Sequence, residues 1–269
     1  MRLTALASLA LIVLASPARA ADPCADVARA VAALHDGDAY QATTQLFASV
    51  KLGCEAEARA LLDRGAAVDA RDRDGATALG RAAAAGKTKL MTLLIGKGAD
   101  VNARAINGST PLFAAAEADR PPAAHLLIDH GADPNIRGRS GLTALAAAAY
   151  NGSAESVELL LKHGADAGAL DDDGKGAMVY AAGRGTARIV ALLIDAGVDV
   201  NRRYGHGLTA LMWAAGHDPS AGVEDVEATL KLLIEHGAAL DLKDDRGKTA
   251  GDIARGLGSE QAAKMLDVN

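Results

Sequence analysis

The sequence predicts an all-α protein built from repeated pairs of helices, and three observations support this prediction. Glycines recur every 33 residues, each just after a cluster of aliphatic residues. A series of Thr-x-Leu motifs runs in phase with these glycines. Hydrophobic residues make up 50% of the chain although only 3% of its residues are aromatic, which indicates a core of small and aliphatic side chains. A fixed period of this length is typical of a repeat architecture.

Residues 1–20 have the features of a signal peptide. Arg2 gives a positively charged start, an apolar run follows, and Ala18-Arg19-Ala20 offers the small residues that a cleavage site requires. An uncleaved membrane anchor is the alternative, but the apolar run is shorter than the roughly 20 residues that span a bilayer. We therefore expect cleavage after Ala20 and no membrane insertion of the mature protein. The abundance of Ala, Arg and Gly suggests a Gram-negative bacterium and hence the periplasm, with secretion as the alternative.

Cys24 and Cys54 are the only two cysteines of the chain. Exported proteins meet an oxidising compartment, in which paired cysteines usually form disulfides. The spacing does not match a CxxC redox motif, and no nearby histidine cluster suggests zinc. We predict a structural disulfide that joins an N-terminal helix, expected at residues 25–36, to the next helical pair.

Each repeated unit has a local interpretation. The threonine can cap the backbone N–H groups at the start of an inner helix, and Pro111 stands where the first helical turn tolerates proline. A glycine such as Gly86 ends the inner helix. The outer helix carries the aliphatic cluster into the core, and the Asp- and Gly-rich stretch that follows has the turn chemistry of a tight hairpin. The predicted unit is therefore helix, helix, hairpin. The glycines that end the outer helices are Gly65, Gly98, Gly131, Gly164, Gly197 and Gly237.

The motifs TALxxAA and LLIxxGADVNAR, as they stand in residues 72–104, resemble the ankyrin repeat family. The resemblance covers residues 40–269 and implies an ankyrin-repeat solenoid of about seven repeats, including degenerate end caps that shield the open ends of the core. An N-terminal capping helix is expected within residues 21–39. The repeats are expected at 40–71, 72–104, 105–137, 138–170, 171–203, 204–243 and 244–269.

The resemblance implies a module that binds another protein through its hairpin tips and the surface of its inner helices. The tip residues differ between repeats, which favours contact with a partner, although loop tips are also polar and variable for solubility alone. The candidate residues at the tips are Arg73, Asp74, Ile106, Asn107, Arg139, Ser140, Asp172, Asp173 and His206. The candidates in and after the inner helices are Tyr150, Asn151, Arg184, Trp213 and His217.

Aromatic residues concentrate late in the chain, at Tyr150, Tyr180, Tyr204 and Trp213. Tyr180 and Trp213 stand one period apart, and packing within the framework is the favoured interpretation for this pair, since the family often has an aromatic residue there. Tyr150, at the end of an inner helix, is the better contact candidate. An insertion at residues 217–225 either takes part in binding or is simply tolerated, because a longer loop costs little to close.

The sequence offers little catalytic or metal-binding chemistry. His130, His163 and His236 precede the repeated glycines, where a histidine complements the helix dipole. His206, His217 and Asp218 match no zinc pattern, and residues 171–174 lack the alternating ligands of a calcium loop. There is no GxSxG, P-loop or HExxH motif. A net charge of −6 argues against nucleic acid as a partner. We expect a monomer without cofactor, metal or catalytic residue.

The function predicted from these observations is non-catalytic binding of a partner protein in the periplasm. Its most concrete form is a protein that neutralises or stabilises an exported enzyme or toxin. A scaffold in an envelope or stress-response assembly is the alternative. A more remote alternative is an enzyme with an unrecognised site near His206, His217 and Asp218.

Overall fold

The computed structural model describes residues 22–35, 38–216 and 221–267. The predicted signal peptide, residues 1–20, and the candidate residue His217 lie outside the described residues. The helices of the first half are α1 (Ala25–Ala32), α2 (Ala39–Leu52), α3 (Glu55–Asp63), α4 (Ala78–Ala84), α5 (Thr88–Gly96), α6 (Pro111–Glu117), α7 (Pro121–Asp129) and α8 (Ala144–Asn151). Those of the second half are α9 (Ala154–Lys162), α10 (Ala177–Gly183), α11 (Ala187–Asp195), α12 (Ala210–Ala215), α13 (Val223–Glu235), α14 (Ala250–Gly256) and α15 (Glu260–Leu266).

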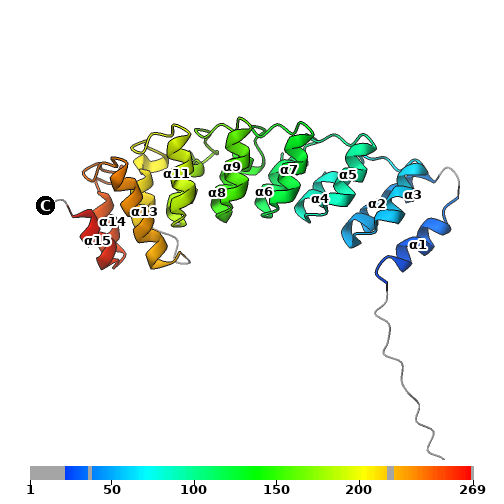
Figure 1. Ribbon diagram of the computed structural model, residues 1–269, viewed down its shortest axis with the longest axis horizontal. Helices are drawn as coiled ribbons and strands as arrows, with labels where there is room; N and C mark the ends of the chain where they lie inside the picture. The colour runs from blue at the N-terminus through cyan, green and yellow to red at the C-terminus, as the bar shows by residue number, and fades with distance from the viewer. Residues whose placement is uncertain (1–21, 36–37, 217–220, 268–269) are drawn as a thin grey trace, which may run out of the picture.

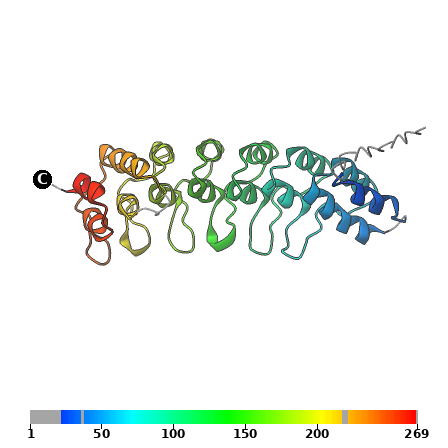
Figure 2. The ribbon, with the colours of Figure 1, turned by 90° about the horizontal axis from the view of Figure 1, so that it is seen from below.

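The helices form two layers, as Figures 1 and 2 show. The inner helices α2, α4, α6, α8, α10, α12 and α14 each pack on the next one along the array. The outer helices α3, α5, α7, α9, α11, α13 and α15 do the same in the second layer. Each inner helix also packs on the outer helix that follows it, and α1 and α15 lie at opposite ends (Figure 1). The predicted all-α solenoid is confirmed.

Threonine side chains start five of the inner helices in the predicted way. The Thr77 hydroxyl accepts a hydrogen bond from the backbone N–H of Gly80 at 3.2 Å. The same cap recurs at Thr110, Thr143, Thr209 and Thr249. Gly176 takes this position before α10, where an added Cβ atom would lie 3.0 Å from the carbonyl oxygen of Ala169. The close backbone therefore leaves little room for a threonine at Gly176.

The core follows the predicted division between small and aliphatic side chains. Paired alanines of the inner helices are buried, as at Ala115-Ala116 and Ala148-Ala149. The outer helices contribute leucines such as Leu127 and Leu160, which are fully buried. Small side chains let neighbouring inner helices approach closely, so few aromatic rings fit between them.

The expected hairpins are present as tight loops rather than as strands. Within the described residues, the only ladder-type pairings are isolated bridges, between Arg71 and Thr77 and between Leu170 and Gly176. Each loop is closed by a backbone hydrogen bond between its arms and another within its turn, for example from Asp72 N–H to the Ala76 carbonyl at 3.0 Å and from Gly75 N–H to the Asp72 carbonyl at 2.9 Å. The arms are too short for a strand because the inner helix begins at once after the turn.

A column of asparagines links the turns that follow successive outer helices. The amide of Asn135 donates to the carbonyl of Gly164 at 2.9 Å, and its side-chain oxygen accepts the N–H of Asp166 at 2.8 Å. Asn102 and Asn201 make the same pair of bonds to the repeat that follows each of them. Gly168 occupies the column between Asn135 and Asn201, so this link is interrupted between repeats 138–170 and 171–203.

Arginines link the hairpin loops in the same way. The guanidinium groups of Arg71, Arg104 and Arg137 each donate to a backbone carbonyl 33 residues further along the chain. Leu170 replaces the arginine in the next repeat, before Arg203 resumes the column by donating to the Lys243 carbonyl. Both columns are therefore interrupted at the same junction. There the Arg202 guanidinium donates one hydrogen bond to the carbonyl of Gly168, at 2.9 Å, which partly replaces the missing bonds.

Restoring the asparagine column should stabilise the array. We expect Gly168→Asn to raise the free energy of unfolding by about 1 kcal/mol, because a new side chain would make two backbone bonds and the unfolded chain would lose freedom. An added Cβ atom would meet only the ends of two flexible side chains, Arg202 and Asp166, at 3.1 and 3.3 Å. Urea denaturation measures the effect. Asn135→Ala is the matched control and should lower stability by a similar amount; a neutral Gly168→Asn would contradict the role given to this column.

The two ends of the array depart from the regular unit. At the N-terminus, α1 packs on α2 and α3, and Cys24 and Cys54 are joined in a disulfide whose Cα atoms lie 5.5 Å apart. Cys24 directly precedes α1 and Cys54 directly precedes α3. The described helix α1 is shorter than the expected span of 25–36. Near the C-terminus, the last residues of the 217–225 insertion lengthen the outer helix α13 to 13 residues, where the other complete outer helices have 9.

Candidate binding surface

The hairpin tips lie in a row and contact one another through their backbones. Figure 2 shows these loops projecting from one side of the inner layer. The N–H of Ile106 donates to the Asp74 carbonyl at 3.2 Å, and that of Asp172 donates to the Ser140 carbonyl at 3.1 Å. The array therefore holds the tips at a fixed spacing, as a continuous edge along the inner helices.

Several predicted contact residues at the tips already have partners within the chain. The Asp74 carboxylate pairs with Arg81, and the Arg139 guanidinium pairs with Glu117. Asp172 pairs with Arg137 at 3.2 Å, and Asp173 lies 3.7 Å from the Lys175 ammonium group. These exposed ion pairs are weak and can exchange for contacts with a partner.

Other predicted tip residues are exposed to solvent. Ile106 is the large apolar side chain among them, with 80% of its surface exposed. Asn107 uses its side-chain oxygen to accept the N–H of Ser109, which shapes its own turn. Ser140 and His206 adopt left-handed backbone conformations with φ angles of 51° and 62°. Arg73 is exposed.

Asn151, a predicted contact residue, has a structural role. Its side-chain amide donates to the carbonyls of Ala116 and Glu117, at 3.0 and 2.8 Å. These bonds fasten the end of α8 to the end of α6 and satisfy carbonyls that a helix end leaves without partners. The amide of Asn151 is therefore committed within the array.

Aromatic and cationic side chains gather on the exposed side of α8, α10 and α12. Tyr150, with 49% of its surface exposed, meets Tyr180 edge to face with ring centroids 5.9 Å apart. The Arg184 guanidinium lies 5.3 Å from the centre of the Tyr150 ring. The Lys175 ammonium group lies 5.4 Å from the centre of the Trp213 ring. We call these five residues the aromatic patch.

Within this patch, Tyr180 is a framework residue and Tyr150 is an accessible one. The Tyr180 hydroxyl donates to the Asp171 carboxylate, which also accepts the N–H groups of Asp173 and Lys175. Burial and this carboxylate raise the pKa of Tyr180 well above its usual value. Tyr180 thus fixes the hairpin onto α10. Tyr204, the other late tyrosine, is buried, and burial raises its pKa to about 12.

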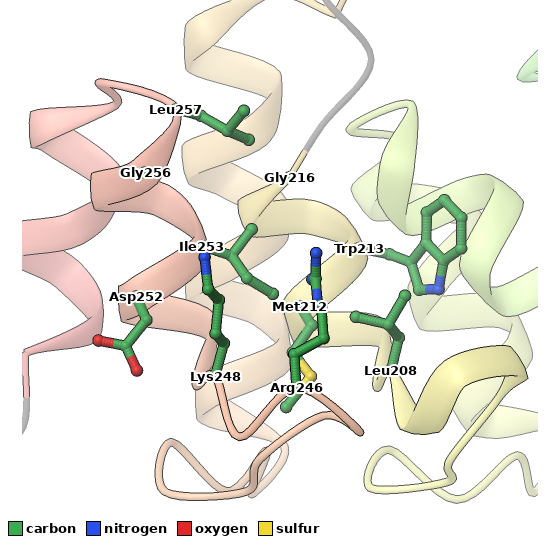
Figure 3. Close-up of a pocket in the computed structure, with 10 residues that line it drawn as sticks. All are labelled: Leu208, Met212, Trp213, Gly216, Arg246, Lys248, Asp252, Ile253, Gly256 and Leu257. Atoms are coloured by element: carbon green, nitrogen blue, oxygen red, sulfur yellow. The ribbon is translucent and has the colours of Figure 1, made fainter.

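A cleft next to the aromatic patch was not predicted from the sequence. It has a volume of about 310 Å³ and lies between α12, α14 and the hairpin loops that precede them (Figure 3). Leu208, Met212, Trp213, Ile253 and Leu257 supply its apolar lining, and Arg246, Lys248 and Asp252 supply its charged groups. One feature of the sequence could have indicated this cleft. Lys175 and Lys248 occupy the same position in their repeats, directly before the residue that caps an inner helix.

The charged groups at the cleft differ in how fully they are paired. Asp244 is nearly buried and lies 2.7 Å from the Arg246 guanidinium. Asp252 accepts the N–H of Thr249 and pairs with Arg255 at 2.9 Å, and these interactions lower the pKa of Asp252 to about 2. Lys248 is exposed and has no carboxylate within ion-pair distance among the described residues. The ammonium group of Lys248 is therefore available to a carboxylate of a partner, whereas Arg246 and Asp252 are already paired.

Possible metal ligands come together at one place in the described part of the chain, where atoms of Cys24, Cys54 and Glu57 lie close to one another. The two sulfur atoms are bonded to each other in the disulfide and so are not thiolate ligands. The remote alternative of an enzyme rests partly on His217 and Asp218, which lie outside the described residues.

Comparison with known families accounts for this architecture. The family of ankyrin repeats (3 copies) matches residues 24–105, 81–171 and 145–225, and the single ankyrin repeat matches residues 206–245. The chain belongs to the ankyrin repeat family. Ankyrin repeat proteins are generally non-catalytic modules that bind other proteins. The sequence matches no curated protein. None of the described helices of this ankyrin repeat protein is long and apolar enough to cross a bilayer.

Proposed function

We propose that this ankyrin repeat protein works in the periplasm, where it binds one partner protein through its hairpin tips and aromatic patch. The main support for this binding site is the exposed Tyr150 ring, which contacts both Tyr180 and Arg184. The half-buried Trp213 lies two inner helices further along, in α12. Tyrosine, tryptophan and arginine are the residues that most often dominate the energy of protein interfaces.

The proposed compartment rests on the leader-like residues 1–20 and on the disulfide. A bond between Cys24 and Cys54 is stable in an oxidising compartment and rare in the bacterial cytosol. A rigid module without an evident catalytic motif suits a protein that neutralises or stabilises an exported enzyme or toxin. The scaffold alternative differs in the number of its partners and in their affinity.

Tyr150→Ala should weaken partner binding about 10- to 30-fold and leave the melting temperature nearly unchanged, because half of the ring is exposed. The measurement uses the mature chain from Ala21 as bait in periplasmic extract of the source bacterium, then titration of the captured protein. Tyr40→Ala is the matched control, since Tyr40 is 86% exposed but lies in α2, far along the array.

The same capture distinguishes the candidate roles. A single tight, stoichiometric partner supports neutralisation or stabilisation, and several weak partners would indicate a scaffold. A partner whose affinity is equal for the wild type and Tyr150→Ala would contradict the proposed surface. Expression of the full-length chain in that bacterium tests the compartment, and its recovery from the cytosol with residues 1–20 intact would contradict the proposal.

A further inference from the structure

The cleft beside Trp213 has the shape and polarity of a site for one side chain of a partner. Its volume of about 310 Å³ is at the lower end of the range of small-ligand pockets, roughly 300–1,000 Å³. Figure 3 shows Leu208, Met212 and Ile253 together at its centre, with Trp213 on one side and Leu257 on the other. An apolar group that enters here removes this lining from water, which favours binding.

Two cationic side chains extend over this apolar lining. Arg246 and Lys248 rise side by side from the loop before α14, and their nitrogen atoms lie at the level of Ile253 (Figure 3). Arg246 pairs with the nearly buried Asp244, and Asp252 pairs with Arg255, which also pairs with Asp267. Among the described residues, Lys248 is therefore the charged group at the rim that has no ion-pair partner. A carboxylate next to the inserted apolar group would pair with it, and a lysine or arginine there would be repelled.

We infer that this cleft receives a short acidic segment of the partner, with a bulky aliphatic or aromatic side chain on the apolar lining and an adjacent carboxylate at Lys248. The inference rests on the proposed function, because it names the chemistry of the partner at one part of the same surface. A segment of this kind matches both the apolar lining and the unpaired ammonium group of Lys248, although the whole chain is acidic, with a net charge of −6.

Trp213 makes a direct test feasible, because it is the only tryptophan of the chain and it lines the cleft. The probe is a synthetic nonapeptide with a central leucine flanked by glutamates, titrated into the mature protein while Trp213 emission is recorded. We expect a saturable change in emission. Replacing the central leucine by alanine, or the glutamates by glutamines, should each weaken binding at least about tenfold, and lysines should abolish it.

Charge reversal at the rim supplies the second measurement. Lys248→Glu should weaken binding of the acidic peptide at least about tenfold and allow binding of the lysine-flanked peptide. Lys162→Glu is the matched control, because it makes the same change of charge in the outer helix α9 and should leave both affinities unchanged. Circular dichroism and melting temperature verify that both variants remain folded.

The outcomes separate this inference from the proposed function. Absence of any saturable emission change, equal affinity for all the peptides, or an acidic peptide that binds Lys248→Glu normally would overturn the inference. Self-association that Lys248→Glu abolishes would overturn it too, since a second copy would then be the occupant. A captured partner that is lost with Tyr150→Ala but retained with Lys248→Glu would leave the proposed function standing and reject the acidic segment.

Discussion

Phe113→Ala should lower the free energy of unfolding by about 3–5 kcal/mol, the usual cost of emptying a fully buried aromatic site. Phe113 is 1% exposed and is the largest fully buried side chain among the described residues. It sits in α6, where the corresponding positions of the next inner helices hold Ala146, Val179 and Met212. Urea denaturation measures the loss. A change below about 1 kcal/mol would mean that the neighbouring helices close the cavity.

The large cost has a specific cause in the following repeat. A Cβ atom added at Gly138 would lie 2.8–3.0 Å from the Phe113 ring, so this glycine makes the room that the ring fills. Gly138→Ala alone should therefore cost about 1–3 kcal/mol through overpacking. In the Phe113→Ala background the same substitution should cost much less. Equal costs in both backgrounds would contradict this coupling between the repeats.

Removing the disulfide is the second change with a large expected effect. We expect the double variant Cys24→Ala, Cys54→Ala to lose about 3–4 kcal/mol, because the bond closes a loop with a sequence separation of 30 and so restricts the unfolded chain. The loss should be local. In a repeat array each unit contacts only its neighbours, and α1 packs on α2 and α3 at the end of the array.

Hydrogen exchange and thiol labelling test this prediction together. Amides of α1 should lose protection in the double variant while those of α8 keep it. A reductant should shift the wild type by the same amount and leave the double variant unchanged. Two freely reactive thiols in the oxidised wild type would contradict the bond itself.

The fold was predictable because each sequence motif of the unit recurs in several repeats. Three motifs recur in phase: the threonine caps, the glycines after the outer helices and the paired alanines. The prediction therefore does not depend on a motif that could occur by chance at a single position. The pairing of Cys24 with Cys54 needed no geometry, since the chain has no other cysteine. The hairpins were the weaker prediction: turn chemistry indicates where the chain reverses, but it does not set the length of the arms.

The candidate surface was only partly predictable. Tyr150 was identified by its place at the end of an inner helix, and it is exposed there. Asn151, its neighbour, looked equally available in the sequence, but its amide is bound to carbonyls of α6. The cleft could not be predicted from the sequence, because its lining residues Met212 and Ile253 come from different repeats. The insertion also displaces the last repeat from the 33-residue period, so the two positions are not in register in the sequence.

The sequence by itself determined the helix–helix–hairpin unit, its order along the chain and the positions of the caps, because these depend on interactions within one repeat. Tertiary structure alone decided which polar groups are free to meet a partner. Asp74, Arg139 and Asn151 are engaged by other residues of the array, whereas Lys248 is left without an ion-pair partner among the described residues. The physical reason is that the charge or hydrogen bond available at a surface depends on neighbours that only the stacked helices and folded loops bring into contact.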